Sequence, residues 1–257
     1  MEVSKETQKK ETHHLVKEEA VSDPDVAKVL QEFERQLIQR EIGKAMLNKK
    51  KTDQGEEDRK QNVKQTFIRF MFTKVETNIA KRHANTDPEP CLILDDLFIG
   101  SIGSAANKQN LRKAGITHIV TCLDFAFMPF TGDFEYLHVP VLDSPTASID
   151  QFFDNAHAFY ETARQVNGKV FVHCFAGVSR STTVACAIVM KSLAVDRMTA
   201  LDRVRLNRPQ VRPNQGFWSK LQQWEKKTGL KDKEAAKSIE QIEEVLEETG
   251  HDHDGSK

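Results

Sequence analysis

Short apolar runs alternate with amphipathic stretches from Leu92 to about residue 228. Apolar runs bounded by turn residues predict strands, and stretches with apolar positions every three or four residues predict helices. The predicted strands lie near Cys91–Leu94, Leu97–Gly100, His118–Cys122, Tyr136–Val141 and Val170–His173. The predicted helices lie near Ala105–Ala114, Ile149–Gln165, Ser179–Leu193, Met198–Leu206 and Gly216–Lys227. This alternation predicts a single α/β domain over residues 91–228.

Residues 1–90 differ from this pattern because charged and amide side chains dominate them, yet they contain two candidate amphipathic helices. The first begins near Asp23 and Pro24, which suit a helix N-terminus. Its apolar face contains Val26, Leu30, Phe33, Leu37 and Ile42. The second covers residues 65–82, and its expected apolar face contains Phe67, Met71, Val75 and Ile79. We therefore expect a polar, partly helical N-terminal extension over residues 1–90.

The segment 229–257 is rich in acidic residues, and Ile239, Ile242 and Leu246 are compatible with one helix that ends at Gly250. We expect an exposed, partly helical acidic tail.

Composition narrows the class of protein. The chain of 257 residues is 39% hydrophobic and 29% charged. Its net charge is -1, so no overall positive potential favours binding to nucleic acid. The longest apolar run, Val184–Met190, is too short to span a bilayer, and the N-terminus lacks the apolar core of a signal peptide. The four cysteines show no CxxC pair or metal-ligand spacing. We expect a soluble protein of the cytoplasm or the nucleus, with no metal and no cofactor.

The stretch VFVHCFAGVSRSTT, Val170–Thr183, carries the candidate chemistry. A strand followed by a glycine loop and a helix start gathers free backbone amides around one point, which favours an anion. Arg180 can bind two phosphate oxygens, and the same field stabilises the thiolate of Cys174. A lone cysteine here would more often be a small buried residue, but its coincidence with Arg180 and Gly177 favours a nucleophile beside a phosphate site.

The segment HCFAGVSRS matches the His-Cys-x5-Arg-Ser signature of cysteine-dependent protein phosphatases, in the form that dual-specificity phosphatases use. LDDLFIGSIGSAANKQNLRKAGITHIVTCLD resembles the opening of their catalytic domain, and RPQVRPNQGFWSKLQQWE resembles its close. The resemblance covers about residues 91–228. It implies a central mixed, mostly parallel sheet of about five strands flanked by helices. The polar residues 1–90 do not fit the rhodanese-like domain of some members, so we expect an atypical member without that domain.

The resemblance also implies a role for each residue of the site. Cys174 is the nucleophile of a two-step reaction through a cysteinyl-phosphate, and the Ser181 hydroxyl supports it as leaving group. Asp143, in VPVLDSPTAS, is the general acid, with Asp124 and Asp150 as competitors. The phosphate-binding groups are the Arg180 guanidinium and the amides of Phe175, Ala176, Gly177, Val178, Ser179 and Arg180. His173 orders the loop, and Asn214 either braces it or caps a helix.

Substrates of this family are phosphorylated proteins, in some cases protein kinases. The uncharged loop residues Phe175, Ala176 and Val178 favour phosphotyrosine, phosphoserine and phosphothreonine over phosphoinositides. A phosphoinositide phosphatase and a phosphoprotein-binding pseudophosphatase remain the alternatives. Because Cys, Arg and Asp are all present, we favour the active enzyme.

Two further hypotheses concern residues outside the loop. The helix over residues 67–82 is expected to pack on the catalytic domain, with binding to calmodulin or an anionic surface as the alternative. Cys122 ends a predicted central strand, and by resemblance to the wider superfamily it is a candidate partner for a reversible disulfide with Cys174. Simple core packing is the alternative for Cys122.

Overall fold

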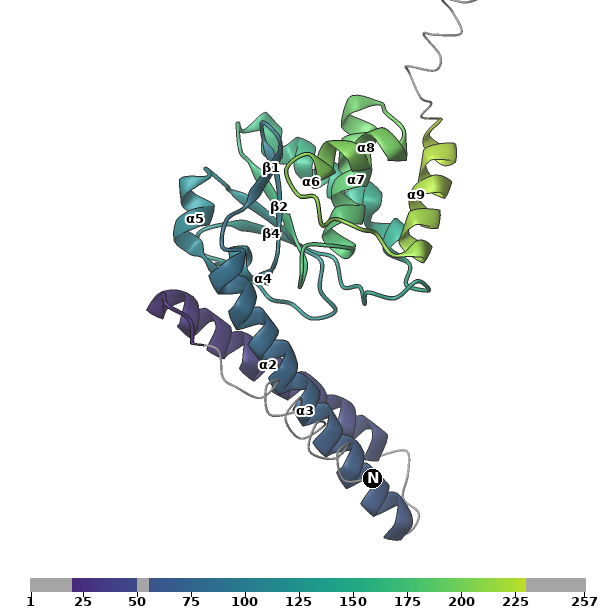
Figure 1. The fold of residues 1–257 in the computed structure, drawn as a ribbon. Coiled ribbons are helices and arrows are strands. Elements are labelled where there is room, and N and C mark those ends of the chain that lie inside the picture. Colours follow the sequence, from purple (N-terminus) through teal and green to yellow (C-terminus); the bar gives the residue numbers. More distant parts are fainter. Residues whose placement is uncertain (1–19, 50–55, 230–257) are drawn as a thin grey trace, which may run out of the picture.

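A five-stranded sheet forms the centre of the protein, in a computed structural model that describes residues 20–49 and 56–229 (Figure 1). The strands are β1 (Cys91–Leu94), β2 (Leu97–Gly100), β3 (His118–Thr121), β4 (Glu135–His138) and β5 (Val170–His173). Their order across the sheet is β1-β2-β5-β3-β4. Only β1 pairs antiparallel, with β2, and the other pairs are parallel. The predicted mixed, mostly parallel sheet is confirmed.

Three predicted strands have the observed bounds, and the two others differ at their ends. The strand predicted to end at Cys122 stops at Thr121, and the one predicted over Tyr136–Val141 is β4, Glu135–His138. β4 is an edge strand that pairs only with β3, and His138 lies opposite the last residue of β3. Beyond that point the chain has no further β3 partner and leaves the sheet as a loop toward Asp143.

Seven short helical segments accompany the sheet: α4 (Ile102–Ala106), α5 (Lys108–Lys113), the 3-10 turn η1 (Ile149–Phe152), α6 (Phe153–Gln165), α7 (Arg180–Leu193), α8 (Arg197–Arg205) and α9 (Gln215–Thr228). The single helix predicted over Ala105–Ala114 is wrong. Asn107 adopts a non-helical conformation, ends α4, and accepts a hydrogen bond from the Asn110 amide through its side chain, which caps α5. Side-chain capping by Asn competes with helix continuation at this position.

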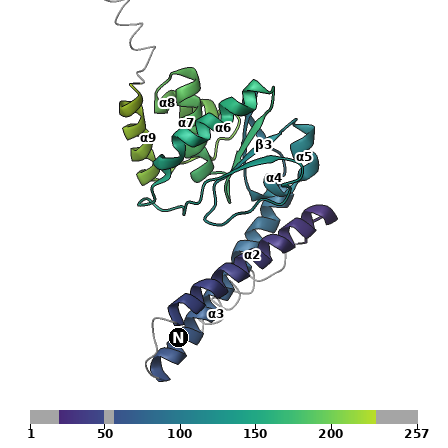
Figure 2. The same cartoon turned by 180° about the vertical axis from the view of Figure 1, so that it is seen from behind.

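The sheet has a hydrophobic core on each face. Val170 and Val172 of β5 belong to one core with α6, α7 and α9, while Phe171 between them belongs to the other. The alternation follows from the two-residue period of a strand. Helices α6 to α9 cover the first face, and α4 and α5 cover the second (Figures 1 and 2).

The second core also contains side chains of the two N-terminal helices, α2 (Pro24–Lys49) and α3 (Glu56–Thr86). The two helices lie side by side and project away from the sheet (Figures 1 and 2). Four of the five residues predicted on the apolar face of α2 are buried: Val26, Leu30, Phe33 and Leu37. The fifth, Ile42, is 48% exposed.

The expected packing face of α3 is wrong. Met71 and Ile79 are exposed, and the buried face consists of Thr73, Thr77, Ala80 and Ala84. A Cβ on Gly103 of α4 would lie 2.3 Å from the His83 carbonyl, so the end of α3 approaches α4 almost backbone to backbone. Small side chains permit such an approach, whereas the larger apolar ones do not. The side chain of Phe67 and the predicted helix near Ile239 lie outside what the structure describes.

Candidate active site

Cys174 follows the last residue of β5, and α7 begins at Arg180, so residues 174–179 form a tight loop at the edge of the sheet where the parallel strands end. The Cys174 Sγ accepts hydrogen bonds from the Gly177 amide and from the Ser181 hydroxyl, both at 3.2 Å. Burial alone would raise the pKa of this thiol. The Arg180 guanidinium and the hydrogen bonds from Ser181 and the loop outweigh burial and hold the pKa below its ordinary value. These groups therefore favour the thiolate form of the sulfur.

The peptide groups of the loop have a uniform orientation. The carbonyls of residues 175–178 all accept hydrogen bonds from donors outside the loop. These pairs are Ile102 N to Phe175 O (3.0 Å), Arg208 Nη2 to Ala176 O (3.1 Å), Arg208 Nε to Gly177 O (2.8 Å) and Arg212 N to Val178 O (2.7 Å). In a trans peptide the N–H points opposite to the C=O, so the amides of residues 176–179 turn inward. Such a nest of amides binds anions.

Gly177 makes this loop geometry possible. Its φ is +68°, a conformation that residues with a side chain rarely adopt. A Cβ on Gly177 would lie 2.5 Å from Arg208 Nη2 and 2.7 Å from the Gly100 carbonyl. No larger residue fits there without moving Arg208 or β2.

Arg180 lies in the first turn of α7 and is 9% exposed. Its Nη1 donates to the Val141 carbonyl at 3.4 Å, and its Nε lies 3.6 Å from Asp143 Oδ2. The Nε is buried, and no described residue is its hydrogen-bond partner. A buried donor left unpaired costs free energy, and an oxygen of a bound phosphate would satisfy it.

The three candidate general acids occupy different positions. Asp143 lies beside the loop, where its Oδ1 accepts hydrogen bonds from Ser179 Oγ at 2.8 Å and Asn214 Nδ2 at 2.9 Å. Asp124 pairs with Arg40 of α2 at 3.1 Å, and Asp150 pairs with Lys220 at 3.3 Å. Only Asp143 of the three contacts the residues around Cys174.

Asn214 both caps a helix and contacts the loop, the two alternatives that the sequence left open. Its side-chain oxygen accepts from the Phe217 amide at 2.9 Å and caps α9, while its amide nitrogen donates to Asp143. The Asn214 backbone N–H also donates to Ser179 Oγ at 3.2 Å. One residue therefore connects the helix start, the loop and the candidate acid.

His173 is buried beneath the loop, with Nε2 3.0 Å from Thr121 Oγ1 and its ring stacked on Phe171. Burial lowers the pKa of its imidazole to about 3, so the ring is neutral at physiological pH. A neutral ring held in this way can orient the loop, but it does not donate a proton near neutral pH.

Cys122 directly follows β3, and its backbone N–H donates to the His173 carbonyl at 2.8 Å. Burial, followed by the nearby negative charge of Cys174, raises the pKa of the Cys122 thiol well above its ordinary value. Cys122 is therefore a protonated thiol close to the reactive one.

Two residues that sequence reasoning missed complete the site. Arg208 holds the loop carbonyls from outside, and Asp87 pairs with Arg208. The sequence shows Arg208 only as one of several arginines near the end of α8, and Asp87 only as a turn residue before Pro88. No local pattern distinguishes them, because they lie 121 positions apart.

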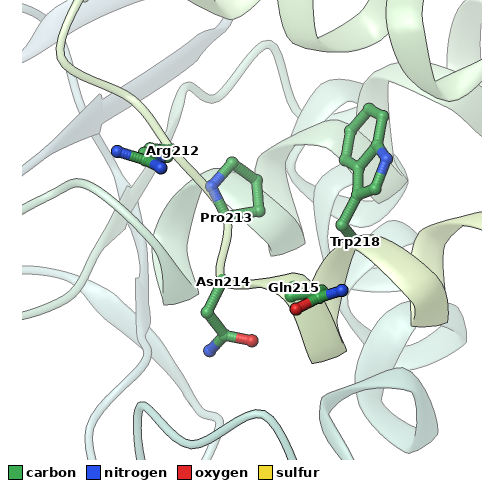
Figure 3. Close-up of a pocket in the computed structure, with 5 residues that line it drawn as sticks. All are labelled: Arg212, Pro213, Asn214, Gln215 and Trp218. Atoms are coloured by element: carbon green, nitrogen blue, oxygen red, sulfur yellow. The ribbon is translucent and has the colours of Figure 1, made fainter.

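A cavity of about 560 Å³ lies next to Asn214, lined by Arg212, Pro213, Asn214, Gln215 and Trp218 (Figure 3). Arg212 is exposed, and among the described residues no carboxylate pairs with its guanidinium. Arg197 lies over the Trp218 ring at 5.2 Å. Asn214, which lines this cavity, also donates to Asp143, the candidate acid.

Two kinds of feature are absent from residues 20–49 and 56–229. No helix there is long and apolar enough to cross a membrane. The same residues contain no group of three or more His, Cys, Asp or Glu side chains placed to hold a metal ion.

Comparison with known proteins agrees with this geometry. Residues 97–227 match the family model for the dual specificity phosphatase catalytic domain. Dual specificity protein phosphatase 1B of Arabidopsis thaliana is 40% identical over 134 residues, which are 52% of this chain and 80% of that protein. The crystal structure of human DUSP28 aligns with a TM-score of 0.53 at 30% identity, covering 55% of this chain and 96% of that one. A mouse protein solved in complex with zinc tungstate aligns at 31% identity with a TM-score of 0.52, covering 55% of this chain and 88% of that one.

Proposed function

This chain belongs to the dual-specificity phosphatases, protein phosphatases that act on phosphotyrosine and on phosphoserine or phosphothreonine, and from that premise we propose a role for each group around Cys174. The observation that carries the proposal is the orientation of the loop. Four carbonyls are bonded outward, so the inward amides and Arg180 surround the Sγ of a thiol whose pKa is lowered.

In the first step the Cys174 thiolate attacks phosphorus in line. The S–P bond forms as the P–O bond to the substrate breaks, and Asp143 gives its proton to the departing oxygen. The loop amides and Arg180 hold the three equatorial oxygens as charge shifts onto them.

In the second step water attacks the cysteinyl-phosphate. Asp143 takes a proton from that water, the O–P bond forms, and the S–P bond breaks to release inorganic phosphate. The Ser181 hydroxyl donates to the departing thiolate, as it does to Sγ at 3.2 Å. Ser179 and Asn214 position Asp143 by binding its Oδ1, and Oδ2, which lies 3.6 Å from Arg180 Nε, is the oxygen that exchanges the proton.

The test is phosphate release from peptides carrying phosphotyrosine, phosphoserine or phosphothreonine, beside a phosphoinositide. We expect activity on the peptides that Cys174→Ser abolishes and that Asp143→Ala lowers by roughly 10²- to 10⁴-fold. Asp150→Ala, a carboxylate paired with Lys220, is the matched control. Activity in Cys174→Ser would contradict the assigned nucleophile, and equal rates with and without Asp143 would place the acid elsewhere. Preferred cleavage of the phosphoinositide would contradict the substrate class.

The cavity beside Asn214 suggests how substrates are selected. We propose that it binds the residue next to the phosphorylated one. Arg212 favours an acidic side chain there, and the Trp218 ring favours an apolar or aromatic one. A phosphorylated protein kinase is one class of protein that would present such a sequence.

Tungstate, which the mouse relative binds, has the shape of phosphate, and we expect it to inhibit this enzyme competitively.

The outer face of α3 is a candidate for partner binding. Met71, Phe72 and Ile79 are 37%, 64% and 40% exposed, and the exposed Arg82 lies one turn further on. We propose that this face binds a groove of the calmodulin type. Titration of the full chain with calmodulin and calcium tests this, with Phe72→Glu as the disrupting variant. Binding to anionic vesicles instead would indicate a membrane surface.

We also propose a cytoplasmic or nuclear location, which imaging of the tagged chain would test.

A further inference from the structure

The outer side of the phosphate loop rests on a buried ion pair. Arg208 is 1% exposed and donates to the Ala176 and Gly177 carbonyls. The same guanidinium binds both oxygens of Asp87, with Nη1 to Oδ1 at 3.0 Å and Nη2 to Oδ2 at 2.6 Å. A buried guanidinium without its carboxylate is strongly unfavourable. The position of Arg208, and with it the orientation of two loop peptides, therefore depends on Asp87.

Asp87 is placed by α3. Its backbone N–H donates to the His83 carbonyl at 2.8 Å, which extends the hydrogen-bond pattern of the helix beyond Thr86. The same end of α3 lies against Gly103, where a Cβ would meet the His83 carbonyl at 2.3 Å. The carboxylate that holds Arg208 is thus fixed to the end of a long helix rather than to a free loop.

A second contact reaches the loop from the same helix pair. The Phe175 ring, next to the nucleophile, stacks on Phe33 of α2 with ring centres 6.1 Å apart and an interplanar angle of 28°. His83 of α3 meets the Phe175 ring edge-on at 6.1 Å. Phe33 is fully buried and also contacts Phe125 and Phe127. The first side chain after Cys174 is partly buried, and it contacts both α2 and α3.

We propose that Asp87 and Phe33 are positioning residues, through which the N-terminal helix pair holds the phosphate loop in its anion-binding conformation. The inference rests on the proposed roles of Cys174 and the loop. Asp87 acts through Arg208 on the Ala176 and Gly177 carbonyls, and Phe33 acts through the ring of Phe175. If Arg208 released these carbonyls, a peptide could rotate and point oxygen at the phosphate, which would repel it. Both residues precede the segment that matches the family model, 97–227, so the proposed support comes from outside the matched segment.

The test uses the full chain with Asp87→Asn, which keeps the shape of the side chain and removes its charge. We expect inhibition by inorganic phosphate to weaken and kcat/KM to fall, each by roughly 10- to 100-fold, as a small misplacement at a site can produce. The pH profile of Cys174 alkylation by iodoacetate should move to higher pH, because misaligned amides stabilise the thiolate less. Glu89→Gln, an exposed carboxylate at the same junction, is the control and should match the wild type.

Phe33→Leu provides the second variant, since it keeps an apolar side chain in the core but removes the ring that stacks on Phe175. We expect the same weakening of inhibition by inorganic phosphate. If Asp87→Asn does not fold, the phosphate inhibition of Phe33→Leu tests whether the helix pair positions the loop. A variant that melts at a lower temperature yet keeps the wild-type phosphate inhibition and alkylation profile would overturn the proposal, because the helix pair would then only stabilise the fold. An inactive wild type, or an active Cys174→Ser, would instead refute the proposed function.

Discussion

Removing the Ser181 hydroxyl tests the electrostatics of the nucleophile most directly. Ser181 Oγ donates to Cys174 Sγ at 3.2 Å, beside the Gly177 amide at the same distance. A hydrogen bond to a charged group contributes about 1.5 kcal/mol or more, and about 1.4 kcal/mol corresponds to one pKa unit. Ser181→Ala should therefore raise the pKa of Cys174 by about one unit, leaving Arg180 and the loop amide as the remaining stabilising groups.

The sign of the effect on pH dependence follows from the thiolate being the reactive form. A higher pKa moves the acidic limb of kcat/KM to higher pH by the same amount. Alkylation by iodoacetate below the pKa should slow by about tenfold per unit. The hydroxyl also supports the thiolate as a leaving group, so Ser181→Ala should slow hydrolysis of the cysteinyl-phosphate. With substrate in excess, the first product should then appear as a pre-steady-state burst.

The assay measures alkylation rate against pH for the wild type, Ser181→Ala and Ser192→Ala. Ser192 lies on the same helix, and its buried hydroxyl has no hydrogen-bond partner among the described residues, so the control removes the same group from α7 without touching the site. A Ser181→Ala profile that superimposes on the wild type would refute the reasoning. In that case Arg180 and the amides would account for the lowered pKa by themselves.

Three other outcomes are expected. Gly177→Ala forces a side chain onto a φ of +68° and against Arg208, so it should abolish inhibition by inorganic phosphate. It should also lower the free energy of unfolding by about 1–3 kcal/mol. Gly132→Ala is the control and should change neither quantity, because a Cβ on Gly132 would have nothing within 4 Å. Peroxide should oxidise Cys174 to the sulfenic acid, which Cys122 then converts to a disulfide with loss of water; peptide mapping without that cross-link contradicts the pairing. Arg212→Glu should raise KM for phosphopeptides with an acidic neighbour and leave a small aryl phosphate unaffected, whereas an equal change for both substrates would exclude the subsite.

The segment from β5 to α7 could be predicted from the sequence in detail. Strand end, nucleophile, glycine and arginine lie within eleven consecutive residues, 170–180, and their geometry follows from a strand, a tight loop and a helix N-terminus in succession. The α/β class was predictable from the alternation of strands and helices, and the mostly parallel sheet followed from the resemblance to the dual-specificity phosphatases. Strand and helix ends were less predictable. Asn107 divides a helix by capping, and β4 ends where its only partner ends.

The packing of α3 illustrates a different failure. Apolar residues at helical spacing predicted a buried face that contains Met71 and Ile79, yet both are exposed. The buried face carries Thr and Ala, and at its Ala84 end α3 approaches Gly103 almost backbone to backbone. Hydrophobicity indicates which residues favour burial, but the distance between two helices decides which side chains fit.

The sequence by itself indicated the candidate anion site, the candidate nucleophile and the α/β fold class, because each depends on residues that are neighbours along the chain. Only the tertiary structure decided what supports that site. Asp143 meets Asn214 across 71 positions, and Asp87 meets Arg208 across 121. A charged residue can pair with many others at such separations, and the path of the backbone selects one. The phosphate loop is thus a local motif whose outer support, including the N-terminal helices, is a property of the folded chain.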